Sequence, residues 1–265
     1  MAITDVGDRR QMSLRSTQSG GSDGVRQPHG LEWILNGTQE FDLSRPVYSL
    51  TDAAEILAVN RSTLGWWLEG GERRGRYYGP VIRAEATGET SLTWPEFVEA
   101  GLLRQYRREL RVRLHEIRSF VSALRDELGV AHPLAYAAPW VGEGRRLLVR
   151  FQELCELRGE LRLIALVDGQ PLLLPPADSF VKRVEWEGDQ PVAWRPHADD
   201  ASPVRCRPDR RFARPAIAGV STSAIVERLD GGETESEVAD QFDLALASVR
   251  WAVAYETSRV AAHAV

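Results

Sequence analysis

The side chains in this sequence with the clearest chemical potential are those that bind phosphates and base edges. They follow Val59 in the stretch 49–71, SLTDAAEILAVNRSTLGWWLEGG, and are Asn60, Arg61, Ser62, Thr63 and Trp66. Guanidinium, hydroxyl and amide groups donate hydrogen bonds to phosphate oxygens and to base edges. We therefore expect this stretch to contact DNA. The alternative is an ordinary helical hairpin that binds no nucleic acid.

A second group of the same kind follows directly, in GERRGRYYG, and consists of Arg73, Arg74, Arg76 and Tyr77. Alternating Gly, Arg and Tyr followed by the apolar run VIRAE predicts a β-hairpin, with 87–89 (Thr-Gly-Glu) as its turn. Beside a DNA-reading helix this hairpin would be a wing, and its arginines would suit the DNA backbone. The alternative is a solvated loop with two half-buried tyrosines.

No comparable pattern of residues in the sequence indicates a catalytic or metal-binding site. The chain has 2 cysteines, Cys155 and Cys206, far apart in sequence, and its 5 histidines do not stand at metal-ligand spacing. No nucleophile–base pair or phosphate-cradling glycine loop is present. We expect a protein that is not an enzyme and that needs no metal and no cofactor.

Length and charge set the broad class. The chain has 265 residues, 43% of them hydrophobic, which suits two or three small domains. Its formal net charge of −5 means that any contact with DNA must come from local patches. No apolar run reaches the roughly 20 residues of a membrane helix, and no signal peptide is recognisable. We expect no membrane association and a location in the cytoplasm.

Local signals place the first group of residues on a helix-turn-helix. Ser49 is a good N-cap with Asp52 three residues later, and the apolar positions after it predict a first helix. Asn60 can cap a second helix over 61–69, which Gly70 ends. The apolar face of the first helix consists of Ala53, Ala54, Ile56 and Leu57.

A capping box at 93–96 (Thr-Trp-Pro-Glu) predicts the start of one long helix that continues to Leu128. Apolar residues recur along it at steps of three and four, close to a heptad stripe. We expect this stripe to be a dimer seam, because a helix-turn-helix usually binds two half-sites; the alternative is a contact within the core. Arg104, Arg108, Arg111 and Arg118 lie off the stripe and are expected on a solvated face. The expected seam is Leu103, Tyr106, Leu110, Leu114, Ile117, Val121 and Leu124.

The rest of the chain divides by composition. Residues 129–200 read as a β-rich connector, in which RRLLVRF and two later segments are expected strands. Turns are expected at Asp168-Gly169 and Gly188-Asp189. The polar stretch 201–214 is expected to be a linker, and the Ser- and Gly-rich residues 1–30 a disordered leader before a domain over 31–128.

Residues 215–258 predict a second helix-turn-helix-like domain. Ser221 can cap one helix, and Thr234 with Glu237 forms a capping box for the next. Its expected outward residues, Ser248, Arg250 and Glu256, are less basic than those of the first pair, so assembly is favoured over DNA binding. The expected fold class is therefore mostly α with a small β-rich middle, a winged helix-turn-helix in front and a second helix pair at the end.

Taken together, these segments resemble a known family. SLTDAAEILAVNRSTLGWWLEG resembles the MerR-like helix-turn-helix of certain VapB-type antitoxins, and SLTWPEFVEAGLLRQYR and IRSFVSALRDELGVAHPLA match the rest of that domain. RPAIAGVSTSAIVERLDGGETESEVADQF resembles the small C-terminal helical domain of unknown function that accompanies it. The family's Pro-x-Ile-x-Gly run followed by a small polar pair corresponds to Pro215, Ile217 and Gly219, then Ser221-Thr222.

The resemblance implies an antitoxin of a type II toxin–antitoxin pair. Its partner would be a VapC-like PIN-domain ribonuclease, and it would bind its own promoter DNA. The chain is larger than common small antitoxins and lacks their long disordered C-terminal arm, so the toxin-binding surface is expected in the middle or C-terminal domain. The competing interpretation is a stand-alone dimeric transcription regulator whose middle domain senses a small molecule.

Overall fold

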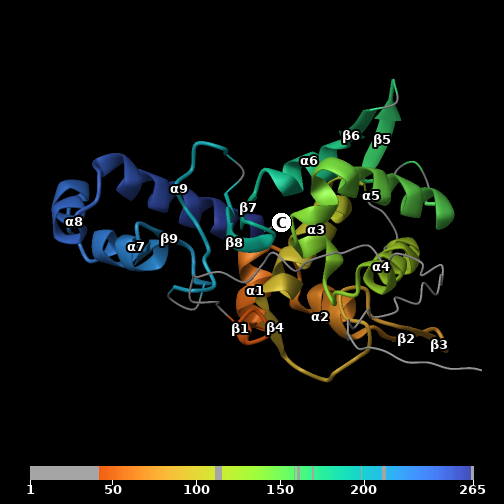
Figure 1. The fold of residues 1–265 in the computed structure, drawn as a ribbon. Helices are drawn as coiled ribbons and strands as arrows, with labels where there is room; N and C mark the ends of the chain where they lie inside the picture. The colour runs from red at the N-terminus through yellow and green to blue at the C-terminus, as the bar shows by residue number, and fades with distance from the viewer. Residues whose placement is uncertain are drawn as a thin grey trace, which may run out of the picture. The chain divides into compact units, whose positions relative to one another are not determined.

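The computed structural model describes residues 42–110, 115–157, 159, 162–168, 170–197, 199–210 and 213–263, and side chains between 106 and 116 lie outside that description. Helices predominate, and the described strands form separate two-stranded antiparallel sheets (Figure 1). The mostly α fold class with small β elements is therefore confirmed. The expected leader 1–30 and the segment 31–41 lie outside the described residues.

The first elements surround a short helix pair. Ser49 caps α1 as expected, because its Oγ accepts from the amide of Asp52 at 3.1 Å. Asn60 holds the N-cap position of α2, but its side chain makes no capping hydrogen bond. Gly70 ends α2 with a positive φ of 65°. The elements are β1 Pro46–Ser49, α1 Leu50–Ile56, α2 Arg61–Glu69, β2 Gly71–Arg73, β3 Arg76–Tyr78 and β4 Ser91–Thr93.

Strand β1 pairs antiparallel with β4, so the chain returns to the base of the helix pair before α3 begins. The expected capping box at that point is confirmed: Oε2 of Glu96 accepts from the Thr93 amide at 2.8 Å. The Thr93 hydroxyl accepts in turn from the Glu96 amide at 3.4 Å. This reciprocal pair satisfies amide groups at the helix start and fixes where α3 leaves the sheet.

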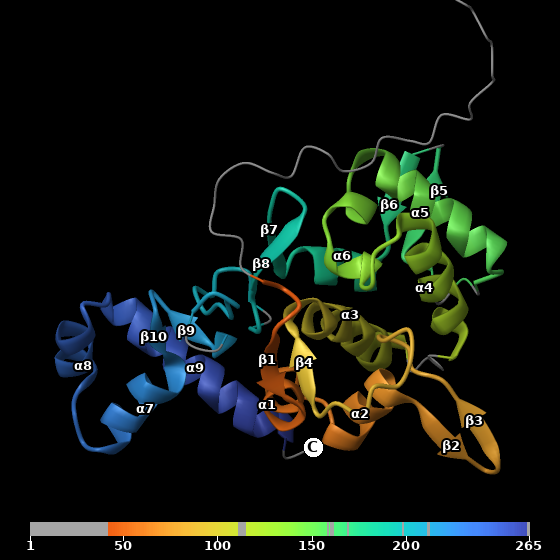
Figure 2. The ribbon, with the colours of Figure 1, turned by 60° about the horizontal axis from the view of Figure 1, so that its bottom comes forward.

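The single long helix expected over 93–128 is a wrong prediction. The structure has α3 Trp94–Leu110 and α4 His115–Leu128, and Figure 2 shows that the two run in different directions. The described apolar residues of both helices belong to one core. Periodicity alone cannot reveal such a break.

The described part of the stripe lies in the chain's own core. Leu103, Ile117, Val121 and Leu124 are between 0% and 3% exposed, and they belong to the same apolar cluster as the helix pair. They are therefore not available as a dimer seam, and the core alternative accounts for them. The side chains of Tyr106, Leu110 and Leu114 lie outside the described residues. Arg104 is also buried, so it does not lie on a solvated face.

The middle region is more helical than expected. RRLLVRF belongs to helix α5, because Leu148 and Phe151 face the core at helical spacing; seven residues are too few to separate the two periods. Both expected hairpin turns are confirmed, since Val167 pairs with Gln170 and Glu187 with Gln190. The elements are η1 Pro133–Ala135, η2 Ala138–Trp140, α5 Gly142–Leu154, β5 Ile164–Val167, β6 Gln170–Leu173, α6 Pro175–Val181, β7 Val184–Glu187 and β8 Gln190–Trp194.

One apolar core joins the helix pair to this middle region. The indole of Trp94 donates to the carbonyl of Pro191 at 2.6 Å, and Phe97 lies edge-on to Trp194. Gly101 on α3 lets this packing close, because a Cβ there would lie 2.6 Å from Cη2 of Trp194. The core therefore continues across the boundary expected at residue 128, where composition alone suggested a change of domain.

The C-terminal elements have a second core, built around Ile225, Val238 and Val249. Ser221 caps α7, and the capping box of Thr234 and Glu237 at α8 is confirmed. The elements are β9 Ala216–Ile217, β10 Val220–Ser221, α7 Thr222–Asp230, α8 Glu235–Phe242 and α9 Leu246–His263. Within the described ranges, no helix is both long and apolar enough to cross a membrane.

The stretch 201–214, expected to be a linker, is packed. Val204, Cys206 and Ala213 are 0% exposed, and the hydroxyl of Tyr48 donates to the carbonyl of Ala213. Composition misled here, because its many polar residues alternate with a few that are fully buried.

Candidate nucleic-acid interface

Helix α2 separates its polar residues from its apolar ones. Leu64, Trp67 and Leu68 are at most 1% exposed and pack inward. Arg61 and Ser62 at the helix start are exposed, and Thr63 is half-buried. The sequence therefore places a guanidinium and hydroxyl groups on the outer side of the first turn, where a nucleic acid could reach them.

Trp66, predicted to contact DNA, packs within the chain. It is half-buried, its ring centroid lies 6.1 Å from that of Tyr78, and it packs against Gly71. Trp66 thus connects α2 to the hairpin that follows. Its contacts within the chain suit a support for the hairpin better than a base contact.

The β2–β3 hairpin carries the second group of basic residues, and Figure 2 shows it projecting beside α2. Arg73 pairs with Arg76 across the strands, and the turn between them is Arg74-Gly75, both with positive φ (55° and 70°). A hairpin was expected here with its turn at 87–89. The hairpin is present, but that turn was a wrong prediction. Tyr77 is 62% exposed, so its hydroxyl and ring are free to meet a partner.

The charge of this surface is largely uncompensated. Among the residues that the structure describes, Arg61, Arg73, Arg74 and Arg76 form no ion pair with an acidic side chain. Arg76 lies over the ring of Tyr78 at 5.5 Å. In a chain with a net charge of −5, these four exposed arginines, which have no acidic partner among the described residues, make the surface of α2 and the hairpin locally basic and form what we call the basic patch.

A buried arginine positions the patch. Arg83 is 6% exposed and donates from Nε to Glu96 at 2.6 Å, while its Nη1 binds Glu69, the last residue of α2. Its other donors reach the carbonyls of Glu89 (3.1 Å) and Ser91 (2.7 Å). The end of α2, the loop 83–91 and the start of α3 are thereby held together. Sequence reasoning missed this residue, because a lone arginine in a short apolar run carries no pattern.

Glu69 has a perturbed acidity as a result. Burial alone would raise the pKa of Glu69, but the amide of Gly88 (2.8 Å) and the charge of Arg83 hold it below its usual value. The carboxylate therefore stays ionised in the fold and also accepts from the amide of Thr87 at 2.8 Å. The loop 87–89, expected as the hairpin turn, instead binds the carboxylate of Glu69 at the end of α2.

Two further arginines hold the loop after the hairpin. Arg118 donates to the carbonyl of Pro80 at 2.9 Å, and Arg125 donates to that of Ile82 at 2.8 Å. Arg118 was expected on a solvated face; burial lowers its pKa, and its guanidinium faces a backbone carbonyl. Both residues fix the position of the hairpin relative to α4, and no sequence signal could have found the two carbonyls.

The C-terminal helices present less for DNA. Arg250 is exposed but is paired with Glu235 at 2.9 Å. Glu256, expected to face outward, is half-buried and accepts from the hydroxyl of Thr222 at 2.5 Å. Its carboxylate therefore serves packing between α7 and α9.

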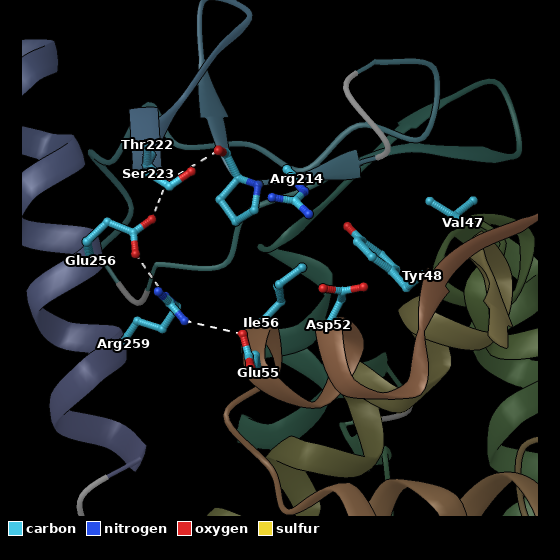
Figure 3. Close-up of a pocket in the computed structure, with 11 residues that line it drawn as sticks. Val47, Tyr48, Asp52, Glu55, Ile56, Arg214, Thr222, Ser223, Glu256 and Arg259 are labelled. Atoms are coloured by element: carbon cyan, nitrogen blue, oxygen red, sulfur yellow. Dashed lines mark hydrogen bonds and ion pairs between the residues drawn. The ribbon is translucent and has the colours of Figure 1, made fainter. Parts of the chain in front are cut away.

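A cleft of about 320 Å³ lies between α1 and the C-terminal elements (Figure 3). Its walls carry Asp52 and Glu55 from α1, with Arg214 and Arg259 opposite. Arg259 crosses the cleft, because its Nη1 lies 3.5 Å from Oε2 of Glu55. Known ligand cavities begin at about 300 Å³, so the space could hold a small polar molecule. Within the described residues, no group of three or more His, Cys, Asp or Glu could hold a metal ion.

Comparisons with known proteins give distant relatives. No protein-family model matches the chain. It is 27% identical over 219 residues to "Uncharacterized protein Rv2308" of Mycobacterium tuberculosis, which covers 80% of this chain and 91% of that protein. It is 28% identical over 230 residues to "Putative antitoxin VapB45" of the same organism, covering 78% of this chain and 93% of that protein.

A solved structure shares the fold. The crystal structure of Rv2018 from Mycobacterium tuberculosis matches with a TM-score of 0.63 at 25% sequence identity, over 79% of this chain and 98% of that one. The chain is thus distantly related to a protein named as an antitoxin of the VapB type.

Proposed function

We propose that this chain is a cytoplasmic antitoxin that represses its own operon by binding promoter DNA and neutralises a VapC-like PIN-domain ribonuclease. The basic patch of α2 and the β2–β3 hairpin is the observation that carries the DNA-binding part. The distant relation to "Putative antitoxin VapB45" supports the antitoxin part. The chemistry of RNA cleavage belongs to the partner, and the chain itself is not an enzyme.

In this proposal the helix pair is a winged helix-turn-helix. Arg61, Ser62 and Thr63 enter the groove from the start of α2, and Asn60 lies at the same end. Arg73, Arg74, Arg76 and Tyr77 contact the backbone from the hairpin. A homodimer would give two such surfaces for two half-sites. Its interface would lie outside the four buried stripe residues Leu103, Ile117, Val121 and Leu124.

The DNA-binding part is tested by gel shift with the upstream promoter and the variants Arg61→Ala and Thr63→Ala. Loss of one phosphate contact should weaken binding and lower the salt slope by about one unit. The matched control is Arg146→Ala, because Arg146 on α5 is 56% exposed and pairs only loosely with Glu143 at 3.7 Å. Unchanged affinity in both test variants would remove α2 from DNA recognition.

The antitoxin part is tested by co-expression with the neighbouring gene. If that gene encodes a PIN-type nuclease, this chain should rescue growth and co-purify with the toxin. If the chain neither rescues growth nor forms a complex with that toxin, the antitoxin proposal is contradicted. This holds even if the chain binds the promoter.

A stand-alone regulator is the second candidate function, and one observation favours it. The cleft of Figure 3 is lined by α1, so a small molecule bound there would contact the first helix of the proposed reader. Such an effector would change promoter affinity in the absence of any toxin. The cleft does not lie in the middle region, where a sensor was expected.

A further inference from the structure

Backbone hydrogen bonds hold part of the arginine-rich segment that follows β8 in place. Cys206 exchanges backbone hydrogen bonds with Trp194 at 2.8 and 2.9 Å, and Arg205 does so with Ala216 at 2.9 Å in both directions. Val204 and Cys206 are 0% exposed. Because side chains alternate along an extended chain, Arg205 and Arg207 point to the other side. A fixed backbone therefore presents both guanidinium groups.

These groups line a small cleft. Its volume is about 120 Å³, and four arginines contribute to its wall: Arg205, Arg207, Arg210 and Arg214. The β9–β10 turn, Ala218-Gly219, lines it as well, and the lining residues that the structure describes include no carboxylate. Small turn residues leave that side open. A concave surface whose described lining consists of arginines, alanines, a glycine and a proline suits an anion.

The arginines differ in how firmly they are held. Arg205 is fixed by Glu185 and donates to the carbonyl of Ser202 at 2.6 Å, so its position is set before any ligand arrives. Arg214 forms no ion pair with an acidic side chain among the residues that the structure describes. It is exposed, and its side chain also lines the larger cleft of Figure 3, so it reaches an anion in the small cleft by turning from one cleft to the other.

Arg207 and Arg210 share one carboxylate. Nε of Arg207 lies 3.3 Å from Oδ1 of Asp209, and Nε of Arg210 lies 3.6 Å from Oδ2. All three side chains are between 38% and 64% exposed. Exposed pairs of this kind contribute little, about 0–1 kcal/mol, so exchanging the carboxylate for a stronger anion costs little.

We propose that this cleft binds a phosphate group. Phosphate carries more charge than a carboxylate and more oxygen acceptors, and guanidinium groups bind it in a bidentate geometry. In the bound state Arg207 and Arg210 turn from Asp209 to the phosphate, and Arg214 turns to it from the larger cleft. Arg205, held by Glu185, donates from a fixed position. The volume suits one phosphoryl group. Its source is a free phosphorylated metabolite or the backbone of a nucleic acid.

The test uses inorganic phosphate and pyrophosphate on the full chain. Both should raise the melting temperature and bind by calorimetry, compared with chloride at equal ionic strength. The double variant Arg207→Gln/Arg214→Gln should weaken phosphate binding about tenfold or more, since each lost charge-assisted contact is strong. Arg228→Gln is the matched control, because Arg228 is 50% exposed and pairs with Glu233 at 3.3 Å away from the cleft.

The variant Asp209→Asn distinguishes a specific phosphate site from a general attraction of anions to the arginines. It removes the competing carboxylate without disturbing the buried side chains, so phosphate affinity should rise a few-fold. No preference for phosphate over chloride, or an unchanged response in a folded double variant, would overturn the proposal. Should the double variant fail to fold, an Asp209→Asn chain with wild-type phosphate affinity would overturn it equally.

The source is identified by comparing two probes. A mononucleotide that binds as tightly as pyrophosphate, with an unchanged DNA salt slope in the double variant, indicates a free metabolite. A reduced salt slope for duplex DNA indicates the backbone. Either result supports the phosphate site. The proposal does not depend on α2, because Arg61→Ala should leave phosphate binding unchanged.

Discussion

The Nε atom of Arg83 donates to Oε1 of Glu96 over 2.6 Å, and this pair ties the loop that follows the β2–β3 hairpin to the first turn of α3. The two side chains are 6% and 8% exposed, so water cannot replace either partner well. Removing one partner of a buried ion pair typically costs about 3–5 kcal/mol. The Arg83–Glu96 pair therefore helps to hold the elements that carry the basic patch in a fixed position.

Gly70 should be required for the position of the hairpin. It has φ of 65° and ψ of −147°, a conformation open almost only to glycine, and a Cβ would collide with the carbonyl oxygen of Tyr78. Gly70→Ala should lower the free energy of unfolding by about 1–3 kcal/mol and weaken DNA binding. Gly75→Ala is the control, since its φ is also positive but its Cβ would meet nothing. Equal effects in urea denaturation would contradict the close approach.

The hairpin arginines should act on DNA through charge alone. Arg74→Ala and Arg76→Ala should each reduce the slope of log K against log salt by about one unit, with little change in sequence preference. Both side chains are exposed, so stability should change little: not at all for Arg74→Ala, and by about 0.5–1 kcal/mol for Arg76→Ala, which removes the contact with the Tyr78 ring. Promoter titrations at several salt concentrations provide the measurement. A slope that stays constant in both variants would place the wing away from DNA.

Glu69 should make the patch acid-sensitive. Its pKa in the fold lies below the ordinary value because of Gly88 and Arg83, after opposing burial. The stabilisation is therefore present above the unfolded-state pKa and is lost as pH falls through the folded pKa. Unfolding free energies measured from neutral to acidic pH should fall less steeply for Glu69→Gln than for wild type. The exposed Glu85→Gln should keep the wild-type slope.

Ile117 tests whether the apolar stripe is core or dimer seam. The side chain is 2% exposed within one chain, so Ile117→Ala should cost about 2–5 kcal/mol through lost packing. Light scattering should show the same oligomeric state as wild type for the folded variant. Val260→Ala, at a residue 64% exposed, should change stability by no more than about 0.5 kcal/mol. If the Ile117→Ala variant loses the oligomeric state of the wild type but keeps its stability, the stripe is a dimer seam and not core.

Local signals in the sequence were sufficient for many elements. Ser49, Thr93, Ser221 and Thr234 cap helices as their side chains predict, because a cap depends on residues within three positions of it. The hairpins around Asp168 and Gly188 follow from turn chemistry in the same way. The helix over 61–69 and a hairpin after it were also predicted from the sequence, although the turn of that hairpin lies at Arg74-Gly75 and not at 87–89.

Only the tertiary structure decided how these elements combine. The apolar stripe of α3 and α4 has the same period whether its partner is another chain or the chain's own core, and burial of Leu103 and Val121 settles that ambiguity for the described side chains. Arg83 and Arg118 hold the fold together, because their guanidinium groups bind carbonyls or carboxylates from other parts of the sequence. Composition called 201–214 a linker, although Val204 and Cys206 anchor it in two cores. Contacts between distant residues leave no periodic trace in the sequence, and here they determine where the charges lie.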